Sequence, residues 1–375
     1  MDPTQARDLY ADLGAVPVIN AKGNLTMLGG SAPSPTVAAA MELSSRYYVD
    51  MDQLLAGSGR VVSGLLGCEA ALVTPGCAAA LVLGTAACIT GDDPELMSRL
   101  PDTSGLKAEV IIQAPQRYKY DRVVRMTGAR LVESGTPESS TRDDFQAALG
   151  GGTAAVLYPC VAEPEGFLSL EEVLEIAGEA GVPVIADAAW RVQPLDVFRH
   201  FATCGADLVG FGAKYFGAPN SSGLLCGRRD LVEAARAHAF AAFERRDFAG
   251  YGRPLKIDRQ EVVGVVAALR EWLREETQAA RDEAASRRGR ALRDRLAGLP
   301  GVGLVPADGD SVTSLGLILG AEAPVDGAGL ADLLEQGNPS IWAHGAGASV
   351  GFSMYTVQDG DEAEIARRVR EILEG

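Results

Sequence analysis

The segment VPVIADAAWRVQPLDVFRHFATCGADLVGFGAK, residues 182–214, contains two strands and two charged residues that decide the fold. VPVIADAA (182–189) and ADLVGFG (206–212) are continuous apolar runs, which is typical of parallel strands buried on both faces. Asp187 comes at the end of the first run, and Lys214 follows the second. Because ligands of open α/β sheets bind at the carboxyl ends of the strands, we expect both side chains in one crevice.

This pair of residues favours a particular cofactor chemistry. A buried carboxylate without a positive partner is very costly, so Asp187 needs a cation. Burial lowers the pKa of an amine, so Lys214 is a candidate nucleophile for a Schiff base. An aldehyde cofactor with a protonatable ring nitrogen satisfies both residues at once, and that cofactor is pyridoxal 5'-phosphate. The chain has only five lysines that could fill this role: Lys22, Lys107, Lys119, Lys214 and Lys256.

A candidate phosphate site lies earlier in the chain. ALVTPGCAAAL (71–81) predicts a strand, a tight turn and a helix over 77–90. The first N–H groups of a helix have no partner within the helix, and its dipole favours an anion there. The backbone of Gly76, Cys77 and Ala78 is therefore predicted to bind the cofactor phosphate.

The rest of the chain predicts an α/β fold with a mostly parallel seven-stranded sheet in a large domain and a smaller C-terminal α+β domain. We expect an irregular N-terminal arm over 1–60, a large domain over 61–257, and a bridging helix with the small domain over 258–375. One long helical segment is expected from about 258 to 299. Beyond the two strands above, apolar runs predict strands at ALVT (71–74), EVIIQ (109–113), ARLVESG (129–135), AAVLYP (154–159) and SSGLLCG (221–227).

Composition narrows the classes of function. The chain has 375 residues, 47% of them hydrophobic, and a net charge of -16, which argues against disorder and against a nucleic-acid partner. The charge-free stretch 70–91 is interrupted by Thr74, Pro75 and Gly76, so a buried helix is expected rather than a membrane span. Six widely spaced cysteines and an acidic, polar start predict a cytoplasmic protein with free thiols and no signal peptide. Three distant histidines predict no metal site.

At these residues the sequence resembles the fold-type I pyridoxal-phosphate enzymes of the aspartate aminotransferase superfamily. The resemblance is to a branch that contains bacterial selenocysteine synthase and D-glucosaminate-6-phosphate ammonia-lyase-like proteins. It covers nearly the whole chain and rests on VINAKGNLTMLGG (18–30), GCEAALVTPGCAAAL (67–81), LPDTSGLKAEVIIQ (100–113), IADAAW (185–190), GAKYFGAPNSSGLLCGRRDLV (212–232) and GRPLKIDRQEVVG (252–264).

The resemblance implies a role for several residues. Lys214 would bind the cofactor aldehyde, Asp187 would meet the pyridine nitrogen, and Gln116 would stand where relatives commonly have a histidine that stacks on the ring. It also implies a homodimer or higher homo-oligomer, with the loop 217–223 near a partner's site. Phe211 replaces a small hydroxyl residue that is common three positions before the lysine.

Four further residues are candidates for substrate binding, and three of them have an ordinary alternative. Trp190 and Arg191 follow the aspartate where relatives usually have small residues and Gln or Glu. His344 stands where the resemblance implies an arginine that anchors a carboxylate. Tyr120 lies in the loop of Gln116. A surface position for Arg191, packing for His344 and a plain loop for Tyr120 and Gln116 are the alternatives.

Three functions follow as hypotheses. The first is an enzyme that transforms a small amino-acid-like substrate at Cα or Cβ through an external aldimine and a quinonoid, by elimination of the ammonia-lyase type. The second is an oxygen-using oxidative decarboxylase or monooxygenase of specialised metabolism, for example on an amino-acid-bearing nucleoside. The third is a non-catalytic binding protein with the same fold, which the presence of Asp187 and Lys214 disfavours. The acidic charge disfavours a transfer-RNA substrate.

Overall fold

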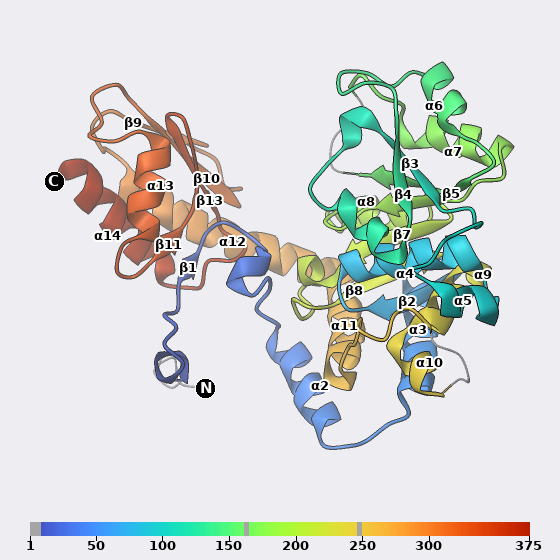
Figure 1. Ribbon diagram of the computed structural model, residues 1–375. Coiled ribbons are helices and arrows are strands. Elements are labelled where there is room, and N and C mark those ends of the chain that lie inside the picture. The colour runs from blue at the N-terminus through green and yellow to red at the C-terminus, as the bar shows by residue number, and fades with distance from the viewer. Residues whose placement is uncertain (1–8, 161–164, 246–249) are drawn as a thin grey trace. The chain divides into compact units, whose positions relative to one another are not determined.

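The chain forms two compact units (Figure 1). The computed structural model describes residues 9–160, 165–245 and 250–375, so the first eight residues of the expected arm lie outside the described range. One unit comprises Ser31–Trp272, and the other comprises Met1–Gly30 with Leu273–Gly375.

The first unit is built on a seven-stranded sheet. Its strand order is β2-β8-β7-β6-β5-β3-β4. Only β8 runs against its neighbours, since it pairs antiparallel with both β2 and β7, while the pairs from β7 to β4 are parallel. The predicted mostly parallel seven-stranded sheet is confirmed. The strands are β2 (Ala70–Thr74), β3 (Glu109–Gln113), β4 (Arg130–Ser134), β5 (Thr153–Pro159), β6 (Val184–Asp187), β7 (Leu208–Gly212) and β8 (Gly223–Gly227).

The charge-free stretch 70–91 forms β2 and the buried helix α4 (Cys77–Thr90), as predicted. All but the first two residues and Cys88 of α4 are buried, and the helix packs against β5, β6, β7 and β8. Its composition of small and aliphatic residues explains this place, because a helix that is apolar all round must be buried. Thr85 and Thr90 remain satisfied there, since their hydroxyls donate to the carbonyls of Leu81 and Ala86.

The region expected to be an irregular arm is partly helical, which corrects that prediction. It contains α2 (Pro35–Ser45) and α3 (Met51–Leu66). α3 packs against β2, and α2 packs against α11 (Arg259–Trp272). Ser34 and Asp50 cap the two helices through side-chain oxygens, which is a local signal for a helix start.

The long helix expected over 258–299 is two helices, α11 and α12 (Glu275–Leu296). The chain is extended at Arg274 between them. Trp272 is buried at the end of α11, where its indole N–H donates to the Val192 carbonyl at 3.0 Å. That anchoring ends the helix within the first unit, so the unit bounds differ from the domain bounds of 60 and 257 expected from sequence.

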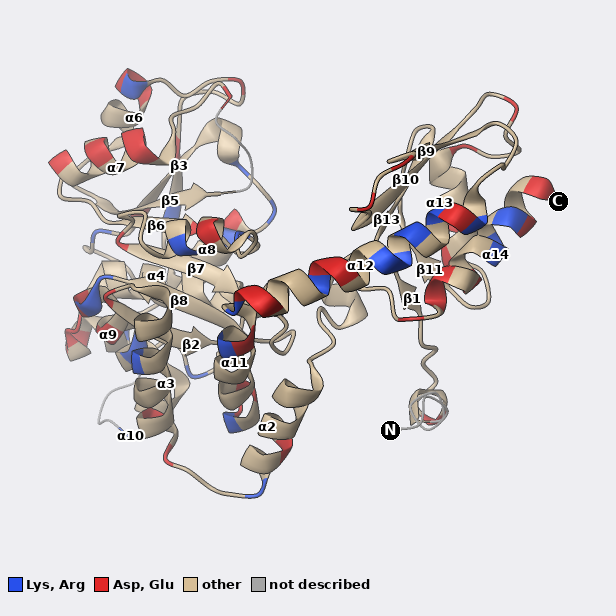
Figure 2. Cartoon of the chain, turned by 180° about the vertical axis from the view of Figure 1, so that it is seen from behind, with Lys and Arg blue, Asp and Glu red and all other residues tan. Residues whose placement is uncertain are grey.

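The second unit is α+β. A four-stranded antiparallel sheet has the order β12-β13-β10-β9, and β1 near the N-terminus pairs in parallel with β11. α12 carries both acidic and basic side chains, with most of its arginines in the second half of the helix (Figure 2). Leu292 and Leu296 on it join the core of this unit. Its elements are β1 (Ile19–Asn20), η1 (Thr26–Leu28), α12, β9 (Val302–Val305), β10 (Ser314–Leu319), α13 (Gly327–Glu335), β11 (Ile341–Trp342), β12 (His344–Ala346), β13 (Ser349–Ser353) and α14 (Asp361–Glu374).

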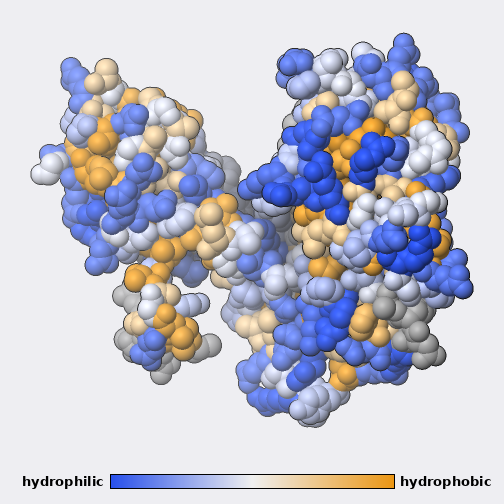
Figure 3. All heavy atoms as spheres, viewed as in Figure 1, coloured by the Kyte–Doolittle hydropathy of each residue, from blue (hydrophilic) through white to orange (hydrophobic). Residues whose placement is uncertain are grey.

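Shorter helices complete the first unit, and hydrophilic side chains cover much of the visible surface (Figure 3). Within the described residues, no helix combines the length and hydropathy needed to span a bilayer. The helices are α5 (Pro94–Arg99), η2 (Ala114–Gln116), η3 (Asp121–Thr127), α6 (Arg142–Ala148), α7 (Leu170–Glu179), α8 (Leu195–Ala202), η4 (Ala213–Phe216), α9 (Arg229–His238) and α10 (Phe240–Arg245).

Candidate active site

Strand register brings the predicted cofactor residues to one edge of the large sheet. Asp187, the last residue of β6, pairs with Gly210 of β7, and Lys214 follows β7 within η4. Gly212 at the end of β7 pairs with Gly223 of β8, which in turn pairs with Thr74 at the end of β2. The carboxyl ends of β2, β6 and β7 therefore lie at the same edge of the sheet. β2 leads into the predicted phosphate turn, β6 ends at Asp187, and β7 is followed by Lys214.

Asp187 is a buried carboxylate, only 6% exposed, with donors on both of its oxygens. Its Oδ1 accepts from the Ala189 N–H at 3.1 Å and from the Cys77 thiol at 3.3 Å. Its Oδ2 accepts from the Tyr118 hydroxyl. Burial together with the negative charge of Asp187 raises the pKa of both the Cys77 thiol and the Tyr118 hydroxyl, so each group remains a proton donor at neutral pH.

Lys214 is half-buried at the start of the loop that leads into β8. Burial lowers the pKa of its amine, so the neutral form is more populated than on a surface lysine. The Nζ atom lies 5.0 Å from the centroid of the Tyr215 ring. The backbone of this loop is fixed because the Ala213 N–H donates to the Ser222 carbonyl at 2.9 Å.

The turn before α4 has the form that an anion cradle requires. Gly76 has φ +87°, a conformation that glycine adopts at little cost. A Cβ placed on Gly223 would lie 2.7 Å from the Cys77 nitrogen and 2.5 Å from the Gly76 carbonyl carbon, so glycine is needed there too. Three parts of pyridoxal phosphate therefore have a fitting group here. The glycine turn fits the phosphate, the buried carboxylate of Asp187 fits the ring nitrogen, and the Lys214 amine fits the aldehyde.

Gln116 has a place in a buried amide network. It is 4% exposed. Its Oε1 accepts from the Gln113 amide at 3.0 Å, and its Nε2 donates to the Pro159 carbonyl at 3.1 Å. Gln113 also bonds the backbone N–H and carbonyl of Leu168. These contacts tie the loop after β3 to the end of β5.

Sequence reasoning missed Tyr118, which lies two residues after Gln116 and contacts Asp187 directly. The loop QAPQRYKYD (113–121) offered a signal, because it holds aromatic residues just after a strand that ends at the carboxyl edge. Gln116 and Tyr120 are the residues of this loop that the sequence predicts for the site, and Tyr118 between them is not. Tyr120 is 51% exposed, and its ring lies edge-on to Tyr118 at 5.9 Å.

The other predicted substrate residues belong to two different units, since Trp190 and Arg191 follow β6 in the first unit and His344 belongs to the second unit. Trp190 is exposed just after the strand-end aspartate, and the Arg191 guanidinium lies 4.4 Å from the centroid of its ring. The Arg191 Nε also donates to the Cys160 carbonyl at 2.8 Å. His344 is exposed on β12 of the second unit, where its Nε2 lies 3.1 Å from the Lys22 carbonyl oxygen.

Phe211 is part of the core. Its ring packs edge-on against Phe198 at 5.0 Å. The adjacent Gly210 faces Cys77, since a Cβ there would lie 3.0 Å from the Cys77 sulfur. Because neighbouring side chains of a strand point to opposite faces, Phe211 faces away from α4 and supports the sheet from the side of α8.

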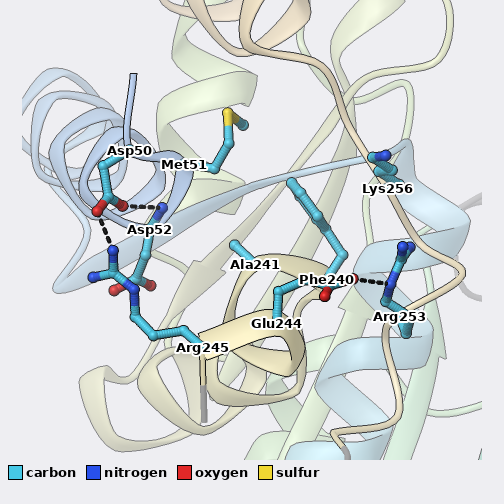
Figure 4. A pocket seen from close by; sticks show the side chains of 9 residues that line it. All are labelled: Asp50, Met51, Asp52, Phe240, Ala241, Glu244, Arg245, Arg253 and Lys256. Carbon is cyan, nitrogen blue, oxygen red and sulfur yellow. Dashed lines mark hydrogen bonds and ion pairs between the residues drawn. The ribbon is translucent and has the colours of Figure 1, made fainter. Parts of the chain in front are cut away.

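A separate cavity of about 590 Å³ lies beside α3 and α10 (Figure 4). None of the predicted site residues lines it. Four of its charged side chains form two pairs, with Arg245 bonded to Asp50 and Arg253 bonded to Glu244 at 2.6 Å. The lining residues are Asp50, Met51, Asp52, Phe240, Ala241, Glu244, Arg245, Arg253 and Lys256.

Comparison with known protein families shows the family to which this chain belongs. Residues 18–284 match the family described as SelA, L-seryl-tRNA selenium transferase. The chain belongs to the SelA family. Among the proteins similar to this chain, 5'-C-glycyluridine monooxygenase-decarboxylase from Streptomyces is 33% identical, with 97% of this chain and 92% of the relative covered. D-glucosaminate-6-phosphate ammonia lyase from Salmonella typhimurium is 32% identical over 71% of this chain and 70% of the relative.

Solved structures agree with this family. The structure of D-glucosaminate-6-phosphate ammonia-lyase matches with a TM-score of 0.85 and 27% identity, covering 100% of this chain and 99% of that one. An aspartate aminotransferase mutant from Thermus thermophilus matches with a TM-score of 0.52 and 19% identity over 95% and 97%, which shows the fold. The predicted fold-type I class and the family resemblance are confirmed. This SelA-family chain is an enzyme of a pyridoxal-phosphate family, and the family and fold imply that cofactor.

The structure also bears on the predicted free thiols. All six cysteines are among the described residues, and each is a free thiol. Among the residues that the structure describes, no group of three or more histidine, cysteine or acidic side chains is arranged to hold a metal ion.

Proposed function

We propose that the chain is a pyridoxal-phosphate enzyme that acts on a small amino-acid-like substrate by elimination of the ammonia-lyase type at Cα and Cβ. The observation that carries the proposal is the meeting of three groups at one sheet edge. These are the buried carboxylate of Asp187, the lysine of lowered pKa at 214 and the glycine turn at 76. The relatives' names support an amino-acid-like substrate class.

The residues divide the work by their chemistry. Bound pyridoxal phosphate supplies an aldehyde and an electron-withdrawing ring that stabilises negative charge at the substrate Cα. Lys214 holds the aldehyde through its neutral amine and then moves a proton at Cα. Asp187 pairs with the ring nitrogen, and the N–H groups of Cys77 and Ala78 hold the phosphate. Gly76 was predicted as a third donor, but its N–H donates to the Thr74 carbonyl at 2.8 Å, so it contributes the shape of the turn instead.

A second candidate function is oxidative decarboxylation with dioxygen. It is supported by the relative named monooxygenase-decarboxylase, to which this chain aligns over 97% of its length. By that relative's name, an amino-acid-bearing nucleoside would be the substrate class. The site residues would have the same holding roles, and only the fate of the charge at Cα would differ.

Covalent trapping tests the cofactor assignment. Reduction with borohydride in the presence of pyridoxal phosphate should fix the cofactor on Lys214, detected by mass spectrometry of the peptide that carries it. Lys214→Ala should lose this label, while Lys107→Ala, which changes an exposed lysine, should keep it. Label on another lysine, or no label in the wild type, would contradict the proposal.

Oxygen dependence separates the two reactions. Candidate amino acids and aminoacyl nucleosides should be screened by mass spectrometry with and without dioxygen. Ammonia release that continues anaerobically supports elimination. Turnover that stops without dioxygen, with one oxygen molecule consumed per product, favours oxidative decarboxylation instead.

Tyr120, Trp190, Arg191 and His344 remain our proposed substrate-binding residues, and Gln116 remains a proposed cofactor-side residue. The homodimer or higher homo-oligomer and the cytoplasmic location also remain proposals. Sedimentation analysis of the purified chain tests the proposed homo-oligomer.

A further inference from the structure

We propose that Tyr118 and Cys77 are positioning residues that hold the Asp187 carboxylate in the orientation that receives the cofactor ring nitrogen. This inference rests on the proposed pyridoxal-phosphate function. Neither side chain is expected to touch the reacting atoms in this role. Each acts through Asp187.

The first step of the argument is the arrangement of donors around the carboxylate. Tyr118 donates to Oδ2, while the Cys77 thiol and the Ala189 N–H donate to Oδ1. An ionised carboxylate has about four lone-pair sites, so three donors leave one open for a further donor. With both oxygens held, the carboxylate plane cannot turn without breaking hydrogen bonds.

The second step concerns the protonation of the two donors. A phenol or thiol that lost its proton would repel the carboxylate instead of holding it. Burial and the charge of Asp187 both raise the pKa of Tyr118 and of Cys77, so both stay protonated beside it. The raised pKa also makes the Cys77 thiol a poor nucleophile, which agrees with a structural role.

The third step is that the loop delivering Tyr118 is itself fixed. Asp121 is 3% exposed, and its Oδ2 accepts from the Tyr118 backbone N–H at 3.1 Å and from Arg117 Nε at 2.5 Å. Gln116, on the other side of Tyr118, is bonded to Gln113 and to the Pro159 carbonyl. The loop is therefore anchored on both sides of the tyrosine, as a positioning role requires.

Cofactor affinity tests the proposal through Tyr118→Phe, which removes only the hydroxyl. The full-length chain, freed of cofactor, is titrated with pyridoxal 5'-phosphate while tryptophan fluorescence is followed. Without the hydroxyl the Asp187 carboxylate is free to turn away from the ring nitrogen, so the variant should bind the cofactor roughly tenfold or more weakly. Tyr355→Phe is the matched control, because the Tyr355 hydroxyl donates to Asp282 in the other unit at 2.8 Å. It should bind like the wild type.

A mutant cycle with Asp187→Ala separates positioning from a merely structural role. In that background Tyr118→Phe should change the cofactor dissociation constant by less than about twofold, because the group it positions is gone. Cys77→Ala should weaken binding, and Cys77→Ser should restore it, since a hydroxyl also donates.

The outcomes distinguish this inference from the proposed function. Wild-type protein that neither binds the cofactor nor is labelled at Lys214 would overturn the function itself. Wild-type binding with Tyr118→Phe equal or tighter would overturn only the positioning role, because the hydroxyl would then be idle or would compete with the cofactor. An equal loss in the Asp187→Ala background would also overturn it.

Discussion

One buried polar group of the first unit, the His238 ring, is satisfied by partners on distant parts of the chain. His238 is fully buried at the end of α9. Its Nδ1 accepts from the Tyr251 N–H at 3.2 Å, and its Nε2 lies 2.8 Å from the Thr90 hydroxyl oxygen. Because the Thr90 hydroxyl donates to the Ala86 carbonyl, the neutral ring with its proton on Nε2 satisfies every atom.

This histidine predicts acid sensitivity. Burial lowers the pKa of His238 to about 4 from its usual 6.5. The unfolded chain therefore binds the proton first between pH 6.5 and 4, so stability falls as the pH falls through this window. By pH 4 the shifted pKa of His238 should lower the free energy of unfolding by about 3 kcal/mol. Urea unfolding from pH 7 to 4 should show the wild type losing about this much relative to His238→Gln. A constant difference between the two proteins would contradict the prediction.

At the scale of elements, the candidate cradle depends on how closely α3 packs on β2. A Cβ at Gly59 of α3 would lie 2.2 Å from the Ala71 carbonyl oxygen, a distance that real contacts do not allow. β2 leads directly into the turn at Gly76. The helix can therefore approach the strand only because residue 59 has no side chain.

A pair of glycine substitutions in this one helix measures that contact. Gly59→Ala should lower the free energy of unfolding by about 1–3 kcal/mol through overpacking. Gly64→Ala in the same helix meets nothing within 4 Å, so it should raise that free energy by about 0.5–1 kcal/mol. Denaturant melts of both variants check the prediction. Equal changes in the two variants would show that helix propensity, and not the contact with β2, determines the change in the free energy of unfolding.

At the scale of the whole molecule, charge bears on the choice of substrate. Several curated relatives are named L-seryl-tRNA(Sec) selenium transferases, such as that of Moorella thermoacetica, 28% identical over 96% of this chain. This chain has 34 basic and 50 acidic residues, and α12 carries side chains of both signs (Figure 2). Nucleic-acid binding gains most of its affinity from basic contacts with phosphates, which this balance opposes.

We therefore predict that transfer RNA does not bind the chain at physiological salt. A mobility-shift titration should show no complex at micromolar protein, where non-specific binders already form one. A complex that weakens steeply as salt is raised would contradict this prediction and would return a transfer-RNA substrate to consideration.

The amino-acid sequence by itself determined the sheet, the helix over 77–90 and the strand-end residues Asp187 and Lys214. Each of these follows from local patterns, because an apolar run fixes a buried strand and the residue after it falls at the sheet edge. The family resemblance followed from the same segments and is confirmed by the match over residues 18–284.

Only the tertiary structure decided which groups meet across long sequence distances. Tyr118 reaches Asp187 from 69 residues away, and β1 pairs with β11 from the opposite end of the chain. The helix likewise breaks between α11 and α12 beside Trp272, whose indole N–H bonds to the Val192 carbonyl. Periodicity and composition indicate which residues are buried, but they do not show which distant residue each one contacts. Those contacts are determined by how the elements pack in the folded chain.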